Sequence, residues 1–368
     1  MRRLSLVWLF AAGVLLCAGV SLAATAYDLG REFAAAEAWR DLTWDMFGAR
    51  HPGVRYSVTD DRTRMLLPED FTFFGYPLCE AEVAFGGDGR LDRLSVSLFN
   101  KGDAGSLATD EEAFAAVGSL PFFSGAKPAA VVGDGRGKTI ACYDWADENL
   151  SAEARIGLSS PTGLSRRVEY VTVELARNRP RETTQASPVP AENLRREGST
   201  LFIDGIPMVQ QGQKGYCAPA TLARVLRYYG IETDMHELAL LLETDAGGGT
   251  RVNAAFPSLT RVAREAGLVR TDYWRIGAEK PAPEAFARAI RDCIDRGYPL
   301  VWAVNRTFPW DGSGEQGGHM RLVVGYDAAQ DTLVYSDSWG AKSLRKRAPL
   351  EAAYGVTEFL TCLHPAEP

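Results

Sequence analysis

A cysteine at the start of a predicted helix is the residue of this chain best placed for nucleophilic chemistry. After Cys217 comes one apolar stripe with helical spacing, made of Leu222, Val225, Leu226 and Tyr229. Pro219 suits a first helical turn, and Gly230 suits the left-handed position that ends a helix. Unpaired N–H groups and the helix dipole at a helix N-terminus favour a thiolate, the nucleophile that covalent acyl transfer needs. A lone cysteine is more often a small buried residue, so the partners of Cys217 decide between the two interpretations.

A cysteine nucleophile needs an imidazole within hydrogen-bond reach, and His319 is the histidine best placed to supply it. It begins a predicted strand over residues 319–326, directly after Gly317 and Gly318, which leave room for a close approach. The other histidines fall in a predicted loop, in a predicted helix and close to the C-terminus, namely His51, His236 and His364. His319 is therefore the candidate general base.

The hairpin that follows His319 predicts a carboxylate partner for it. If residues 327–331 form a five-residue loop, Tyr326 pairs with Thr332. Counting back then places Asp337 diagonally opposite His319 on the same face of the sheet. Diagonal neighbours lie roughly 7–8 Å apart at the backbone, within side-chain reach. Asp337 can therefore meet one imidazole nitrogen while the other nitrogen points outward.

Together these residues resemble the papain-like cysteine peptidases. In that group a glutamine stands six residues before the cysteine, as Gln211 does here, and Asn-Ser-Trp-Gly follows the histidine strand, where this chain has Asp337-Ser338-Trp339-Gly340. Within the group the chain is most similar to the bacterial double-glycine, or bacteriocin-leader-processing, peptidases, over about residues 203–363. The motifs that carry this likeness are Cys217-Ala218-Pro219-Ala220, Tyr228-Tyr229-Gly230, Gly249-Thr250 and the stretch from Leu259 to Gly267-Leu268.

The resemblance implies a role for each candidate residue. Cys217 would attack the substrate, His319 would act as base and then as acid, and Asp337 would orient the imidazole. Gln211 and the Cys217 N–H would bind the oxyanion. Tyr216 and Ala218 depart from the family, which has Asp or Asn before the cysteine and Gly after it. We find no ATP-binding or exporter domain, so the resemblance implies no double-glycine leader substrate.

The elements that would position these residues predict an α+β domain over residues 200–368, with a helical half and an antiparallel sheet half. Beyond the Cys217 helix, we expect helices over 235–243, 257–266 and 283–296, and strands over 300–304, 319–326, 332–336 and 358–362. The site would lie between the halves. The glycine-rich loop 246–250 lacks the lysine of a phosphate-binding loop, and we expect neither a cofactor nor a metal.

Residues 27–177 form a separate predicted α+β domain in which we find no constellation of chemistry. We expect a helix over 29–47, a hairpin with strands over 81–85 and 94–99, a helix with a Thr109–Glu112 capping box, and strands over 138–143, 152–158 and 167–175. This domain is interpreted as an accessory or binding module. Residues 178–199, rich in Arg, Pro, Glu, Thr, Gln and Ser, are the expected linker.

Residues 1–26 are expected to be a signal peptide, which makes this an exported protein. Arg2 and Arg3 precede an apolar run, and small residues allow cleavage after Ala23 or Ala26. An uncleaved membrane anchor is the alternative. No later stretch is apolar enough to span a membrane. The net charge of −7 argues against nucleic acid as a partner.

Five of the six cysteines remain once Cys17 leaves with the leader. An odd number leaves one free thiol in an oxidising compartment. The pairing that respects the domains is Cys79–Cys142 with Cys293–Cys362, and four reduced, buried thiols are an equal alternative.

The function that these residues favour is an exported cysteine peptidase acting on a peptide or protein substrate. Two other classes stay open. One is a Cys-His-Asp acyltransferase of the transglutaminase kind, which would use the same triad with an amine acceptor. The other is a catalytically inactive peptide-binding protein on the same fold.

Overall fold

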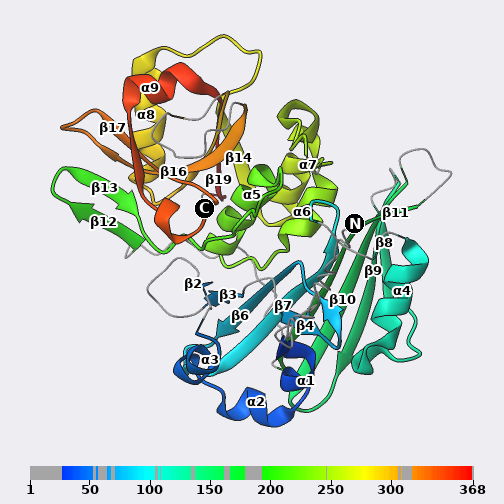
Figure 1. Cartoon of the computed structure of the whole chain (residues 1–368). Helices are drawn as coiled ribbons and strands as arrows, with labels where there is room; N and C mark the ends of the chain where they lie inside the picture. Colours follow the sequence, from blue (N-terminus) through cyan, green and yellow to red (C-terminus); the bar gives the residue numbers. More distant parts are fainter. Residues whose placement is uncertain are drawn as a thin grey trace, which may run out of the picture.

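The computed structural model describes residues 27–52, 55–56, 64–67, 71–103, 107, 109–133, 137–160, 166–178, 193–245, 247–305, 308 and 317–366. The expected signal peptide and most of the expected linker lie outside these residues. Two antiparallel sheets of eight strands each organise the chain, one in each half of the sequence (Figure 1). Within the described ranges, no helix has the length and apolar character needed to cross a membrane.

The N-terminal domain is built on an antiparallel sheet in the order β2-β3-β6-β7-β11-β10-β9-β8. Its elements are β1 (Tyr27–Asp28), α1 (Leu29–Phe33), α2 (Ala36–Asp41), α3 (Trp44–Arg50), β2 (Arg55–Tyr56), β3 (Arg64–Leu66), β4 (Phe71–Phe73), β5 (Tyr76–Pro77), β6 (Glu80–Phe85), β7 (Leu91–Asn100), α4 (Asp110–Ser119), the 3-10 helix η1 (Pro121–Phe123), β8 (Ala130–Gly133), β9 (Lys138–Ala146), β10 (Leu150–Ser159) and β11 (Arg167–Arg177). Helix α4 packs on β10 and β11 and closes the core of this domain.

The C-terminal domain places helices against a second sheet, in the order β12-β13-β16-β15-β19-β14, with β17 and β18 branching from β16. Its elements are β12 (Leu194–Glu197), β13 (Thr200–Ile203), α5 (Cys217–Tyr228), α6 (Met235–Leu241), α7 (Val252–Glu265), β14 (Leu268–Trp274), α8 (Pro283–Ile294), β15 (Leu300–Val304), β16 (His319–Asp327), β17 (Thr332–Ser336), the 3-10 helix η4 (Ala341–Ser343), β18 (Lys346–Pro349), α9 (Leu350–Val356) and β19 (Thr357–Pro365). Helix α5 packs on β16, and this packing brings the N-terminal end of α5 next to the start of β16.

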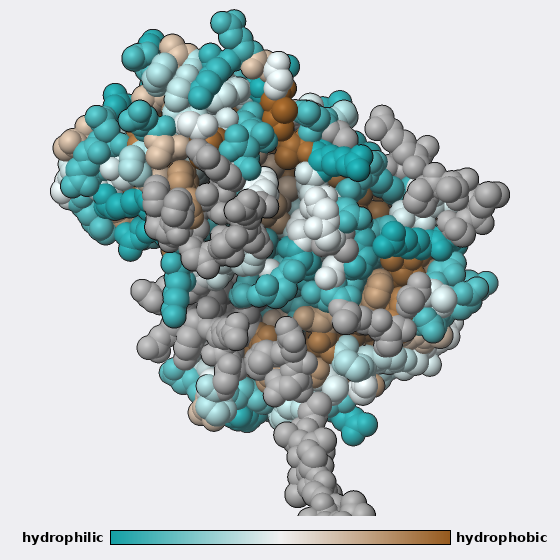
Figure 2. All heavy atoms as spheres, turned by 45° about the horizontal axis from the view of Figure 1, so that its top comes forward, coloured by the Kyte–Doolittle hydropathy of each residue, from teal (hydrophilic) through white to brown (hydrophobic). Residues whose placement is uncertain are grey.

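Apolar side chains gather into one core in each domain. The face in Figure 2 is mostly hydrophilic, and hydrophobic residues reach it only in separate patches. A small third cluster of Ile140, Tyr170 and Leu240 joins the two domains, where α6 lies against β10 and β11. The domains are therefore packed on each other over the part of the C-terminal domain that contains α5 and α6 (Figure 1).

The expected α+β architecture is confirmed, but the boundaries of some helices and strands differ. The helix predicted over 29–47 is wrong, because the chain forms the three short helices α1, α2 and α3 there. Leu42 is extended, and the Thr43 hydroxyl accepts from the Met46 N–H to begin a new helix. Helix α7 begins five residues before Pro257, so this proline lies inside the helix and not in its first turn.

Several strands were not predicted from the sequence. Strands β12 and β13 form a hairpin that extends the C-terminal sheet through β16, and β12 lies within the stretch assigned to the linker. Its sequence, Leu-Arg-Arg-Glu, is mostly exposed and carries no apolar alternation. Residues 179–192 of that stretch lie outside the described residues.

The five cysteines of the described residues are free thiols. The Cys79–Cys142 pairing is wrong, because Cys79 directly precedes β6, Cys142 lies on β9, and three strands separate β6 from β9. Four strand spacings amount to about 19 Å, beyond the roughly 7 Å limit between the Cα atoms of a disulfide. Cys293 on α8 and Cys362 on β19 do meet, and a hydrogen bond from Cys362 lowers the pKa of the Cys293 thiol.

Candidate active site

Cys217 is the first residue of α5, as its sequence context predicted. The predicted stripe anchors the helix, since Leu222, Val225, Leu226 and Tyr229 are all buried. Gly230 ends it with φ of +78°. The preceding residue, Tyr216, makes no side-chain cap, so the first N–H groups of α5 are left for another acceptor. The thiol itself is half-buried.

His319 begins β16, and its imidazole lies between Cys217 and Asp337. Its Nε2 atom is 2.6 Å from Oδ1 of Asp337, and both side chains are almost completely buried. The Cys217 thiol hydrogen-bonds the same imidazole. Because Asp337 occupies Nε2, Nδ1 is the nitrogen that faces the sulfur. The structure therefore brings the three predicted residues into one line.

Electrostatics around the imidazole favour its protonated form. Burial alone would lower the pKa of His319, but the hydrogen bonds to Asp337 and Cys217 outweigh burial and raise it to about 9. Burial would likewise raise the pKa of Asp337, yet its hydrogen bond with His319 and the charges of His319 and Arg321 hold it below its usual range. At neutral pH the site thus contains an imidazolium beside an aspartate anion.

Arg321 is a residue near this line that sequence reasoning missed. It lies two positions after His319 on β16, its side chain is 1% exposed, and its Nε atom is 3.3 Å from Oδ2 of Asp337. The guanidinium lies within 5.0–5.9 Å of three ring centroids, those of Trp302, Phe308 and Tyr335. The sequence signal that could have identified Arg321 is its spacing of two residues from His319, which places both side chains on the same face of the strand.

The hairpin reaches the predicted register near the site by a different route. Asp327, not Tyr326, pairs with Thr332, so the loop is shorter than predicted. A bulge between Val323 and Gly325 then shifts the pairing by one residue, and Leu322 pairs with Ser336 as expected. The shorter loop and the bulge shift the strand pairing by one residue in opposite directions, so Asp337 lies where the hairpin count predicted.

Contacts between α5 and the sheet hold the cysteine against the histidine. The Thr221 hydroxyl donates to the Met320 carbonyl oxygen at 3.2 Å. Fully buried Arg224 donates from Nε to the Pro207 carbonyl oxygen at 3.0 Å and from Nη2 to the Ser336 hydroxyl at 2.5 Å. Trp339 stacks on His319 with ring centroids 5.8 Å apart. The relative position of Cys217 and His319 is thus set by buried polar contacts as well as by apolar packing.

Gln211, the predicted oxyanion donor, is buried on the approach to α5. Its backbone N–H donates to the Ser338 carbonyl oxygen at 3.0 Å, which ties it to the residue after Asp337. Its Nε2 atom donates to the Lys214 carbonyl oxygen at 3.4 Å. Gln213 is exposed and Gln210 is half-buried. Of the three glutamines, Gln211 is the one that is buried, and its backbone is tied to the residue after Asp337.

Residues 203–361 match the model of the Peptidase_C39 like family. The resemblance noted over about residues 203–363 is therefore confirmed, and over this range the chain is similar to the C39-like peptidases. Among solved structures, xylellain, a cysteine protease from Xylella fastidiosa, is similar at 15% identity over 44% of this chain and 83% of that chain, with a TM-score of 0.28. A TM-score this low carries no argument about the present chain. No curated protein matches the sequence.

We expect the imidazole of His319 in this C39-like domain to titrate near pH 9 when histidine resonances are followed by NMR. Asp337→Asn should lower this pKa, because the anion that stabilises the imidazolium is lost. His51, buried beside aromatic rings, serves as an internal reference with a pKa lowered by burial. The pKa of His319 in the folded protein exceeds its ordinary value of about 6.5. The protonated imidazole therefore contributes fully to the free energy of unfolding below about pH 6.5, and this contribution is lost as the pH rises through about 9. An unchanged His319 titration in Asp337→Asn would contradict the ion pair.

Proposed function

We propose that this protein is an exported cysteine peptidase that hydrolyses peptide bonds through a Cys217 thioester. The observation that carries the proposal is the line from the sulfur through the imidazole to Asp337, with 2.6 Å between Nε2 and Oδ1. A nucleophile, a base and a group that orients the base are the parts that covalent acyl transfer requires. The C39-like family match supports the same class of chemistry.

The proposed reaction begins with attack of the Cys217 thiolate on the substrate carbonyl carbon. The carbonyl oxygen becomes an anion, which the Cys217 N–H and the Gln211 side-chain amide would stabilise. The imidazolium of His319 then gives its proton to the leaving amine, and the C–N bond breaks to leave a thioester. A water molecule, deprotonated by His319, attacks the thioester and releases the acid product and the thiolate. Asp337 keeps the imidazole in one orientation throughout.

The test of this proposal is the mass of the products from a diverse synthetic peptide library, with and without an added primary amine. A peptidase yields fragments that have gained water, and the amine leaves their masses unchanged. Cys217→Ala should abolish the products, and Gln211→Ala should lower turnover by about 10²–10³ while small haloacetamides still alkylate Cys217, since alkylation develops no oxyanion.

Other results would point elsewhere. Intact peptides that have gained the amine and lost ammonia would identify an acyltransferase of the transglutaminase kind. Peptide binding without any products would favour an inactive binding protein, and products that persist in Cys217→Ala would exclude this cysteine as the nucleophile.

Export is the second part of the proposal, and it is supported by the Arg2-Arg3, apolar run and small-residue order at the start of the sequence. Sequencing the N-terminus of the protein from its native host should read from Ala24 or Tyr27. A chain that begins at Met1 in a membrane fraction would show that the segment is an uncleaved anchor.

A further inference from the structure

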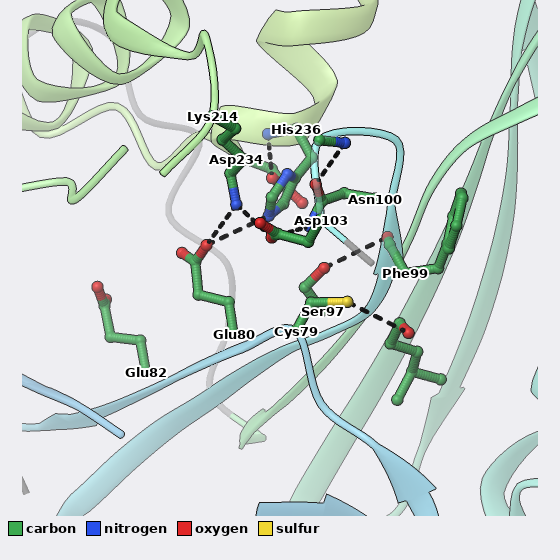
Figure 3. A network of polar contacts seen from close by, with 12 residues as sticks. Cys79, Glu80, Glu82, Ser97, Phe99, Asn100, Asp103, Lys214, Asp234 and His236 are labelled. Carbon is green, nitrogen blue, oxygen red and sulfur yellow. Dashed lines mark hydrogen bonds and ion pairs between the residues drawn. The ribbon is translucent and has the colours of Figure 1, made fainter. Parts of the chain in front are cut away.

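The loop directly before Cys217 is attached to the N-terminal domain by a buried lysine. Lys214 stands three residues before the cysteine, and its side chain is 2% exposed. It points out of the peptidase domain, and its Nζ atom lies 2.6 Å from Oδ2 of Asp103 and 3.4 Å from Oε2 of Glu80 (Figure 3). Burial would lower the pKa of Lys214, but the two carboxylates outweigh burial and raise it, so the side chain is a cation.

On the N-terminal side, the turn after β7 is shaped to receive this lysine. Asn100, which is fully buried, donates from Nδ2 to Oδ2 of Asp103 at 2.7 Å and accepts from the Gly102 N–H at 2.9 Å. A Cβ atom on Gly102 would lie only 2.7 Å from Cδ of Lys214. The turn therefore orients its carboxylate and leaves space for the lysine stem.

On the peptidase side, the backbone of the same lysine organises the predicted oxyanion donor. The Lys214 carbonyl oxygen accepts from Nε2 of Gln211 at 3.4 Å and from the Tyr216 N–H at 2.7 Å. Tyr216, the residue that precedes Cys217, is 1% exposed, and its ring centroid lies 5.3 Å from Nζ of Lys214. The side chain and the carbonyl oxygen of Lys214 thus face different domains.

A second contact with the N-terminal domain lies beside Tyr216, in the same loop. The ring of His236 lies 6.0 Å from that of Tyr216, and its Nε2 atom lies 3.8 Å from Oε2 of Glu80. Glu80 therefore faces both Lys214, within this loop, and His236, on α6 (Figure 3).

We propose that Lys214 is a positioning residue through which the N-terminal domain holds the oxyanion loop, residues 211–216, in its active conformation. This inference rests on the proposed peptidase function. It makes the N-terminal domain a working part of the active site, acting through Asp103 and Glu80.

Other ion pairs across the interface provide a matched control. Nζ of Lys138 lies 2.8 Å from Oε1 of Glu243 and donates to the Leu241 carbonyl oxygen at 3.2 Å, so it joins β9 to the end of α6. This pair also links the domains through a lysine, but it does not involve residues 211–216. Loss of the Lys138–Glu243 pair therefore measures how much a weaker contact between the domains alone changes kcat.

The experiment compares kcat, KM and haloacetamide alkylation of Cys217 in full-length variants. Lys214→Met and Asp103→Asn should each lower kcat by about tenfold or more, with KM and the alkylation rate within about twofold, because a misplaced oxyanion donor affects only the transition state. Gly102→Ala, which keeps every charge but presses on the lysine stem, should lower kcat in the same way. Lys214→Arg should retain most of the activity, and Lys138→Met should keep kcat within about twofold.

The inference is overturned if Lys214→Met keeps a near-normal kcat, or if it loses no more than Lys138→Met. A fall in the alkylation rate together with kcat in Lys214→Met would also overturn the inference, since the substitution would then have caused a general loss of structure around Cys217. In these cases an active wild type leaves the peptidase assignment standing. A wild type that cannot hydrolyse peptides would remove both proposals.

Discussion

The contact between His319 and Asp337 is sealed from water, and the surrounding structure is arranged to keep a buried carboxylate ionised. A buried charge is stable only when it is paired and hydrogen-bonded. Asp337 meets this requirement with the imidazole at 2.6 Å, the Ser338 N–H at 2.9 Å and the guanidinium of Arg321 at 3.3 Å. Because β16 supplies both His319 and Arg321, this strand determines where the carboxylate can lie. The bulge in β16 and the end of β17 at Ser336 bring Asp337 to that place.

The cysteine depends on the same strand, since α5 is fixed to β16 and β17 through Thr221 and Arg224. The loop before α5 is held at two points, by the Ser338 carbonyl on the sheet side and by Asp103 on the side of the N-terminal domain. This gives a physical context for Tyr216, which stands where the double-glycine peptidases that the chain resembles have Asp or Asn. Its ring is buried between Lys214 and His236 at the domain interface. The position before Cys217 is thus packed between two residues, Lys214 and His236, that face Glu80 of the N-terminal domain.

Local patterns were sufficient to predict much of this arrangement. A helix start, a strand start and a hairpin count predicted Cys217, His319 and Asp337, because each depends on residues nearby in sequence. The resemblance added Gln211. Arg321 was missed because a charged residue in a strand usually faces water, and its burial depends on Asp337 and the aromatic rings around it, which the sequence does not place there. Lys214 could not be predicted, since its partners lie 111 and 134 residues away in another domain. The helix predicted over 29–47 failed for a local reason, as the Thr43 cap begins a new helix within it.

The most direct test of this arrangement is which thiol reacts with a peptidyl acyloxymethyl ketone, an electrophile that a catalytic cysteine attacks. The described part of the chain holds five free thiols, of which Cys79, Cys142 and Cys217 are half-buried and Cys293 and Cys362 are buried. Intact-mass analysis should show one adduct, located at Cys217, absent in Cys217→Ala and formed much more slowly in His319→Ala. An adduct that persists in Cys217→Ala, or one that forms at the wild-type rate in His319→Ala, would contradict the account.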